Sequence, residues 1–326
     1  MLSKRNCILA GLLLLQIALI MLLALSHRKS SSPQAGFFSG FEADHVVGLT
    51  VTDETGKSTI LQRKDQEWVL SSENDVPADK TKVDKAIKKL LAIRPERLIT
   101  RTRESHPRFL VSDKKFAQKV TIAFADGKTK SLYLGTAPSY KTTHVRAEDD
   151  EQVFLVKEFS SWEIPQNPSS WWLADYVDLA DDLMVGLHIT NDRGVLELKK
   201  DSKNNWRLTG LPPETSLDAT NVQELLDAAR RINVTEYLGR EEKEEYGLKN
   251  PPATLTLTGK SGTIGLLIGT LDSASNTHVL KSSDSPFYVR GNNAALSPIL
   301  NASPEALVAG TEKAMKEEKD IAAPEK

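Results

Sequence analysis

The chain has 326 residues, enough for two ordinary domains with complete hydrophobic cores. Its charges nearly balance, with 42 Lys and Arg against 44 Asp and Glu. This balance argues against a dedicated nucleic-acid-binding protein, because such proteins usually carry a strong basic excess. The one cysteine, Cys7, excludes an intramolecular disulfide and a cysteine-based zinc site. Chains without disulfides occur in both the cytoplasm and the periplasm, so the cysteine count leaves the compartment open.

An apolar segment, residues 7–25, follows a short basic N-terminus and is interrupted only by Gly11 and Gln16. Its length is close to what a helix needs to cross a bilayer core. A cleaved signal peptide is the alternative, since residues 24–26 resemble a small-x-small cleavage site. Basic residues flank the segment on both sides, but a short basic N-terminus favours residues 30–326 lying outside the cytoplasm. The segment therefore predicts a transmembrane anchor.

Strand-like and helix-like patterns follow a linker at residues 30–45. Apolar and polar residues alternate over residues 47–51, which predicts a strand with one buried face. Asp79 is a candidate N-cap for a helix that Pro95 ends. The apolar stripe of this helix is formed by Val83, Ala86, Ile87 and Leu90. Two later hairpins are predicted around turns at residues 126–127 and 148–151.

The second half of the chain repeats this order of patterns. Matches at two independent places share one offset of 134 positions, and an earlier match has an offset of 138, which indicates a duplication with a short deletion. A second helical stripe follows Asp218 at the same spacing as the first. The matched pairs are residues 47–52 with 185–190, Trp68 with Trp206, 134–136 with 268–270, and 143–145 with 277–279.

These patterns predict an α+β fold. An N-terminal transmembrane helix is expected to precede two tandem repeats, each a mostly antiparallel sheet with one packed helix. The last residues are charged, contain few apolar groups and are expected to be disordered. The predicted boundaries are an anchor at residues 1–29, a linker at 30–45, repeats at 46–180 and 181–308, and a tail at 309–326.

The block Glu245-Tyr246-Gly247-Leu248-Lys249-Asn250-Pro251 follows a predicted helix and precedes a predicted hairpin. With the upstream strand, turn and Trp-containing strand, it resembles the domain-of-unknown-function 4340 family over about residues 46–308. The first copy has Phe109-Leu110-Val111 where the second has Tyr246-Gly247-Leu248. The resemblance implies a single-span membrane protein with extracytoplasmic domains, associated with ABC-type export systems like the gliding-motility transporters. It implies no catalytic residues.

No motif in the sequence assembles catalytic, cofactor-binding or metal-binding chemistry. Gly259-Lys260-Ser261 lacks the further glycine of a P-loop, since Thr254 occupies that position, and it lies in a predicted strand turn. The six histidines show no pair at metal-ligand spacing, and no Gly-x-Ser-x-Gly elbow is present. His144 and His278 are equivalent by duplication and are expected to occupy half-exposed strand positions. Acidic residues at 149–151 and 181–182 are expected to be solvated.

Aromatic residues provide the candidate interaction sites. Trp68 and Trp206 are expected to pack on the helix of their own repeat, because both are retained through the duplication. The tryptophans of the connecting segment are expected to lock the repeats together or to expose an aromatic patch for a partner or a glycan. The Tyr246 block is expected to form a tight turn that needs Gly247. The candidate interaction residues are Trp162, Trp171, Trp172, Tyr246, Gly247 and Leu248.

Together these features favour a non-enzymatic accessory module held at the bacterial inner membrane by residues 7–25, with its repeats in the periplasm. Its expected partners are the lipid bilayer and an envelope or membrane protein, such as an ABC-type permease; no nucleic acid and no cofactor are expected. An extracytoplasmic module that binds a small ligand or glycan is one alternative, and an uncharacterised hydrolase is another.

Overall fold

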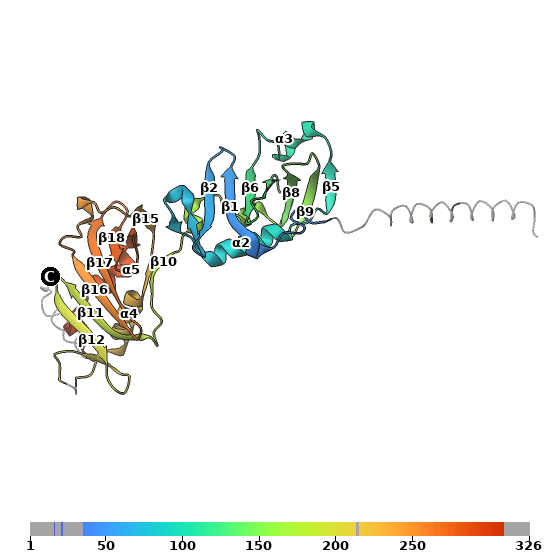
Figure 1. Cartoon of the computed structure of the whole chain (residues 1–326). Coiled ribbons are helices and arrows are strands. Elements are labelled where there is room, and N and C mark those ends of the chain that lie inside the picture. Colours follow the sequence, from blue (N-terminus) through green and yellow to red (C-terminus); the bar gives the residue numbers. More distant parts are fainter. Residues whose placement is uncertain (1–15, 17–20, 22–34, 213–214, 310–326) are drawn as a thin grey trace, which may run out of the picture. The chain divides into compact units, whose positions relative to one another are not determined.

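The computed structural model describes residues 35–212 and 215–309, together with Gln16 and Met21 (Figure 1). Over these residues the chain is mostly β, with large antiparallel sheets and few, short α-helices. The predicted α+β class is therefore wrong. The sequence contains one strong helical stripe in each half against many alternating segments, and those segments build sheets of eight and nine strands that dominate the fold.

The predicted transmembrane helix corresponds to residues 7–25, which lie outside the described residues except for Gln16 and Met21. Within the part of the chain that the structure describes, no helix is both long enough and apolar enough to cross a membrane. The predicted tail at residues 309–326 also lies outside the described residues, apart from Ala309.

The chain divides into two compact units. Unit 1 comprises Met1–Arg63 and Thr81–Asn167, and unit 2 comprises Lys64–Lys80 and Pro168–Lys326. The predicted domain boundaries remain a prediction, and each unit is described by itself below.

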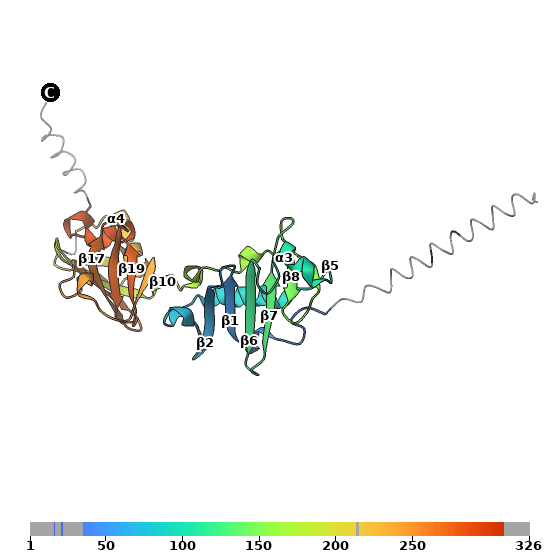
Figure 2. The ribbon, with the colours of Figure 1, turned by 90° about the horizontal axis from the view of Figure 1, so that it is seen from above.

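The first sheet has nine strands in the order β4-β3-β2-β1-β6-β7-β8-β9-β5. Figure 2 shows β2, β1, β6 and β7 side by side in that sequence. Each pairing described along the sheet is antiparallel, such as β1 with β2 and β6. The strands are β1 (Val46–Asp53), β2 (Ser58–Lys64), β3 (Glu67–Leu70), β4 (Val76–Pro77), β5 (Arg97–Thr100), β6 (Gln118–Phe124), β7 (Thr129–Leu134), β8 (Thr142–Ala147) and β9 (Val153–Lys157).

Helix α2 (Lys80–Ala92) begins directly after Asp79 and ends before Pro95. Its four stripe residues, Val83, Ala86, Ile87 and Leu90, are buried, which confirms the apolar face predicted for this helix. A short helix, α3 (His106–Phe109), lies between β5 and β6. The buried residues of β1 and β6 alternate with less buried ones, so the sheet has an apolar face formed by Leu49, Val51, Val120 and Ile122 among others.

The second sheet has eight strands in the order β13-β12-β11-β16-β17-β18-β19-β15. Helix α4 (Ala219–Arg230) buries Val222, Leu225, Leu226 and Ala229. Asp218 caps it, because its carboxylate accepts hydrogen bonds from the Thr220 and Asn221 amides. The strands are β11 (Met184–Asn191), β12 (Gly194–Lys200), β13 (Trp206–Leu208), β15 (Glu236–Gly239), β16 (Ala253–Gly259), β17 (Thr263–Asp272), β18 (Thr277–Ser282) and β19 (Tyr288–Asn292).

The C-terminal half also contains β10 (Asp175–Asp178), which pairs with β14 (Arg231–Asn233), and helix α5 (Asn293–Leu300). The two large sheets have the same connectivity. Strands β3, β2, β1, β6, β7, β8, β9 and β5 occupy the positions of β13, β12, β11, β16, β17, β18, β19 and β15. Helix α2 follows β4, an additional edge strand with no counterpart in the second sheet, whereas α4 follows β13; each helix precedes the strand at the opposite edge, β5 or β15. The same strand order in both sheets is the result expected from the duplication of one ancestral unit.

The two equivalent tryptophans have different environments. Trp68 is 1% exposed and belongs to the core. Trp206 is only half-buried, and the Lys200 ammonium lies 5.0 Å from its ring centroid. The difference follows from position, because β13 is the outermost strand of its sheet and has only three residues to cover its faces.

Candidate functional site

The Tyr246 block is packed into the body of unit 2. Tyr246 and Leu248 are 4% and 7% exposed, and Gly247 has the left-handed φ of 66°. The carbonyl oxygen of Tyr246 approaches Gly269 so closely that a Cβ there would lie 2.1 Å from it. Thr270 Oγ1 also donates a hydrogen bond to the Glu245 carbonyl at 2.9 Å. The block therefore forms a loop that is clamped against strand β17.

Unit 1 retains the same arrangement despite its different sequence. Leu110 occupies the position of Gly247 and has a left-handed φ of 54°. A Cβ on Gly135 would lie 2.0 Å from the Phe109 carbonyl oxygen, and the Thr136 amide donates a hydrogen bond to that oxygen at 2.9 Å. Gly135 and Gly269 are equivalent by duplication, so the close approach of a loop to a glycine is a shared structural feature of both units.

The three candidate tryptophans are placed differently. Trp171 is 1% exposed, and its carbonyl accepts a hydrogen bond from the Asp79 amide. Trp172 is partly buried within unit 2, where its Nε1 donates to Glu73 Oε2 at 3.0 Å and its ring packs edge-on against Tyr237. Trp162, in contrast, is 70% exposed. Of these three side chains, Trp162 has the surface that a partner could reach.

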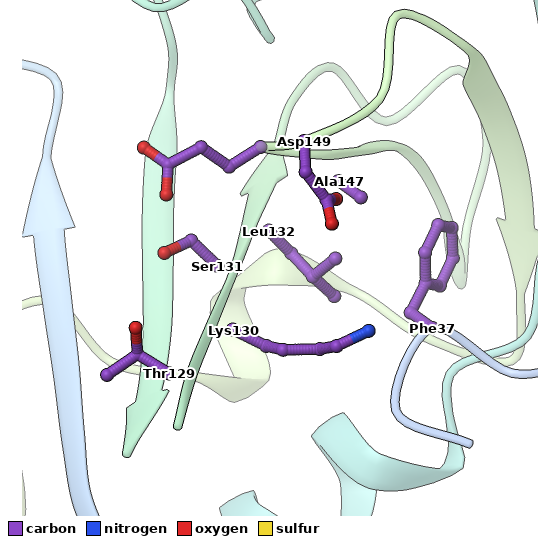
Figure 3. A pocket seen from close by; sticks show the side chains of 8 residues that line it. Phe37, Thr129, Lys130, Ser131, Leu132, Ala147 and Asp149 are labelled. Atoms are coloured by element: carbon purple, nitrogen blue, oxygen red, sulfur yellow. The ribbon is translucent and has the colours of Figure 1, made fainter. Parts of the chain in front are cut away.

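A hollow that the sequence did not indicate lies in unit 1 between strand β7 and the turn that joins β8 to β9 (Figure 3). Its volume is about 180 Å³. Figure 3 shows the side chains of Lys130, Leu132 and Asp149 turned toward a common space, with Phe37 across it. The lining residues are Phe37, Thr129, Lys130, Ser131, Leu132, Ala147, Glu148 and Asp149.

The register of β7 and β8 explains why the hollow exists. Their pairing starts at Leu132 with Ala147, and the Glu148 amide adds one hydrogen bond to the Ser131 carbonyl. The first residues of β7, Thr129 and Lys130, therefore extend beyond the end of β8. The uncovered strand end leaves space that Phe37 borders from the N-terminal segment.

A buried arginine fixes the turn beside the hollow. Arg146 is 3% exposed, and its Nη1 donates to the carbonyl oxygens of Ala147, Glu148 and Asp150. Its Nε donates to the Val111 carbonyl at 2.7 Å, and its Nη2 donates to Asp113 Oδ1 at 2.5 Å. A guanidinium with several fixed acceptors holds the turn in one conformation.

The ionisation state of Asp113 suits its pairing with the buried Arg146. Burial acts to raise the pKa of its carboxyl, but the hydrogen bond and the charge of Arg146 outweigh that effect and lower the pKa. The carboxylate is therefore ionised at neutral pH and compensates the buried guanidinium.

Glu148, at the hollow, forms an ion pair with Lys119, which also lies close to Tyr133. The hydrogen bond from Lys119 Nζ, at 2.5 Å, is the main cause that lowers the pKa of Glu148. Burial acts to lower the pKa of Lys119, but its contacts with Glu148 and Tyr133 raise it overall. Burial raises the pKa of Tyr133. These shifts favour the charged forms of Glu148 and Lys119 and the neutral form of Tyr133.

The equivalent histidines are held by neighbours in their own units. Thr136 Oγ1 lies 2.8 Å from His144 Nδ1, and burial lowers the pKa of His144. His278 Nδ1 donates to the Gly269 carbonyl at 2.9 Å. Both are buried, not half-exposed as predicted, because the Phe109 ring packs against His144 and Asn293 Oδ1 lies 3.1 Å from His278 Nε2. In residues 35–212 and 215–309, no three His, Cys, Asp or Glu side chains are grouped to hold a metal ion.

Unit 2 has a hollow at the corresponding strands, with a volume of about 320 Å³. It is lined by residues of β16, β17 and the end of β18, including Gly265, Leu266 and Lys281. Its lining contains no carboxylate, and Leu280 stands where unit 1 has Arg146 at the duplication offset. The position of the hollow therefore follows from the shared topology, whereas the acidic turn fixed by arginine is particular to unit 1.

Comparison with known proteins gives one match. A family model described as Domain of unknown function (DUF4340) matches residues 68–251, which is more than half of the chain. The matched part includes α2, the residues of the unit 1 hollow other than Phe37, the tryptophan segment and the Tyr246 block. Comparison with curated proteins and with solved structures finds no match.

Proposed function

The chain belongs to the domain-of-unknown-function 4340 family, and on this premise we propose that it is a non-enzymatic accessory module that binds a protein partner. The observation that carries the proposal is the hollow of unit 1 with its turn fixed by Arg146. A surface that is ordered before binding loses less conformational entropy when a partner docks, which strengthens association.

The dimensions and chemistry of the hollow favour a protein over a metabolite. A volume of about 180 Å³ is below the range of roughly 300–1,000 Å³ that is usual for small-molecule sites. It is large enough for one side chain of a partner. Phe37 offers apolar surface above the buried Leu132, while Glu148 and Asp149 are exposed carboxylates at the rim, and Lys130 also lines the hollow. The matching group is a long basic side chain, whose methylenes would contact Phe37 while its charge meets Asp149, since Glu148 is already paired with Lys119.

We further propose that the partner is a component of an ABC-type export system and that both units lie outside the cytoplasm. The apolar segment at residues 7–25 supports attachment of the chain to the bacterial inner membrane. Family membership supports the association with export components, since this is what the resemblance implies for the chain. A membrane attachment also raises the effective concentration of a membrane-bound partner.

Purification of the full chain from cells in mild detergent tests the proposal. The wild-type chain should recover a permease, and Asp149→Arg should lose it, because the added cation repels a basic side chain at the rim. Glu54→Arg, a matched charge reversal at an exposed position in the turn after β1, should retain the permease. The proposal would be contradicted if Asp149→Arg recovered the permease at the wild-type level. It would also be contradicted if none of the three chains recovered a permease.

Trp162 favours a second candidate function, the binding of a glycan. Its indole is 70% exposed, and exposed aromatic rings stack on sugar faces. Trp171 and Trp172 do not offer such a surface, because the first is buried and the second is engaged with Glu73 and Tyr237. A screen of envelope glycans by thermal melting decides this candidate. A shift in the melting temperature that Trp162→Ala abolishes would support it, and no shift would exclude it.

A further inference from the structure

The connection that follows the long helix has opposite charge in the two units. Residues 94–115 of unit 1 contain seven basic and three acidic residues. The corresponding 22 residues of unit 2, 231–252, contain four basic and five acidic residues. The two stretches align through the loops clamped on Gly135 and Gly269, so they descend from one ancestral segment. The basic excess is therefore a property that only unit 1 has.

The basic residues of unit 1 lie at the edge of its sheet. Strand β5 is outermost, next to β9. Arg94, Arg97 and Arg101 are exposed, and among the described residues none of the three forms an ion pair. The nearby acidic residue Glu96 is already neutralised by Lys157 at 3.0 Å. We call the three arginines the β5 basic surface.

The chain enters unit 1 beside this surface. A Cβ on Gly36 would lie 3.3 Å from the Ile93 carbonyl oxygen and 3.7 Å from Arg94 Cγ. The Phe37 ring packs edge-on against Phe154 of β9, with ring centroids 6.0 Å apart. The apolar segment ends at residue 25, eleven residues before Gly36. Eleven residues reach at most about 40 Å, so Gly36, which adjoins the Arg94 end of the β5 basic surface, stays within that distance of the end of the apolar segment.

We propose that the β5 basic surface binds the phosphates of anionic lipid headgroups. A guanidinium donates paired hydrogen bonds to phosphate oxygens and remains charged at all relevant pH values. The adjacent Leu98 is 36% exposed and can rest at the headgroup boundary. Nucleic acid is the less suitable polyanion for this surface, because the whole chain carries a net charge of −2. The inference rests on the proposed membrane attachment and adds the lipid class and the surface that recognises it.

Hydrogen exchange of the full chain in lipid nanodiscs tests the inference. One set of discs contains phosphatidylcholine only, and the other also contains phosphatidylglycerol. We expect amides of residues 94–103 to exchange at least several-fold more slowly in the anionic discs, and added salt should remove the difference. Each basic residue near an anionic surface strengthens the contact about fivefold, so three substitutions should weaken it on the order of 100-fold.

The decisive variant is Arg94→Gln, Arg97→Gln and Arg101→Gln combined, which keeps most of each side chain while removing the charge. Its exchange should be the same in both discs. The matched control, Arg231→Gln, Lys243→Gln and Lys249→Gln combined, alters the equivalent segment of unit 2 and should keep the protection. If both kinds of disc retained the wild-type chain and its amides exchanged at equal rates in both, the proposed contact with anionic lipid would be refuted, while the membrane attachment would stand. Failure of both discs to retain the chain would refute the membrane attachment as well.

Discussion

Replacing Gly135 with alanine would place a methyl group 2.0 Å from the Phe109 carbonyl oxygen and 2.6 Å from Val111 Cγ1. Ordinary contacts need more than 3 Å, so the loop must move by about 1 Å. That movement disrupts the 2.9 Å hydrogen bond from the Thr136 amide, at about 1 kcal/mol, and repacks the fully buried Val111, at about 1–3 kcal/mol. We expect Gly135→Ala to lower the free energy of unfolding by about 2–4 kcal/mol.

Urea unfolding of the full chain in detergent, followed by circular dichroism, measures this loss, and hydrogen exchange assigns it to unit 1. Gly262→Ala is the control, because a Cβ there meets nothing within 4 Å and the backbone φ is not in the left-handed region. The control should change the stability by less than about 1 kcal/mol. A Gly135→Ala chain within about 0.5 kcal/mol of wild type would refute the clamped-loop interpretation, since the methyl group would then have found room.

Two further changes test the features that surround the clamped loop and the hollow. Leu110→Gly should stabilise unit 1 by about 1 kcal/mol in urea unfolding, because Leu110 holds a left-handed φ of 54° that glycine adopts without strain; a destabilised chain would show that the leucine side chain matters more than the strain. Glu148 has a lowered pKa in the folded chain, so its ion pair with Lys119 stabilises the fold above the unfolded pKa and is lost as the pH falls through the folded pKa. The difference in urea midpoint between wild type and Glu148→Gln should therefore be present at pH 7 and shrink as the pH falls through the lowered pKa of Glu148, and a difference that stays constant as the pH is lowered would contradict this assignment.

Hydrophobic periodicity predicted the regular elements well, and the internal matches indicated the equality of the two sheets. The buried stripe of α2 and the cap of α4 by Asp218 are local properties, which residue spacing encodes directly. The predicted fold class was wrong, because the class depends on the share of residues that lie in strands. Short strands such as β5 and β15 give little signal in the sequence by themselves.

The hollow could not be predicted, because it arises from the register between β7 and β8 and from the burial of one arginine. The sequence marks residues 148–151 as an acidic turn but does not reveal that Arg146 points into the protein to hold it. The aromatic candidates show a related limit. A tryptophan pattern does not distinguish Trp171, which is 1% exposed, from Trp162, which is 70% exposed. The left-handed Leu110 is likewise invisible in a sequence, since leucine rarely adopts that conformation.

The position of β5 affects how the chain gains its structure during synthesis. Arg97 of β5 pairs with Leu155 of β9, so the strand has no sheet neighbour until the final hairpin of unit 1 has emerged. In unit 2, Tyr237 of β15 likewise has no sheet neighbour until its partner, Val289 of β19, has been synthesised. A nascent chain thus carries an open strand edge through most of each unit, and such edges recruit other strands. Truncations that stop short of residue 153 would leave β5 permanently unpartnered and prone to aggregation.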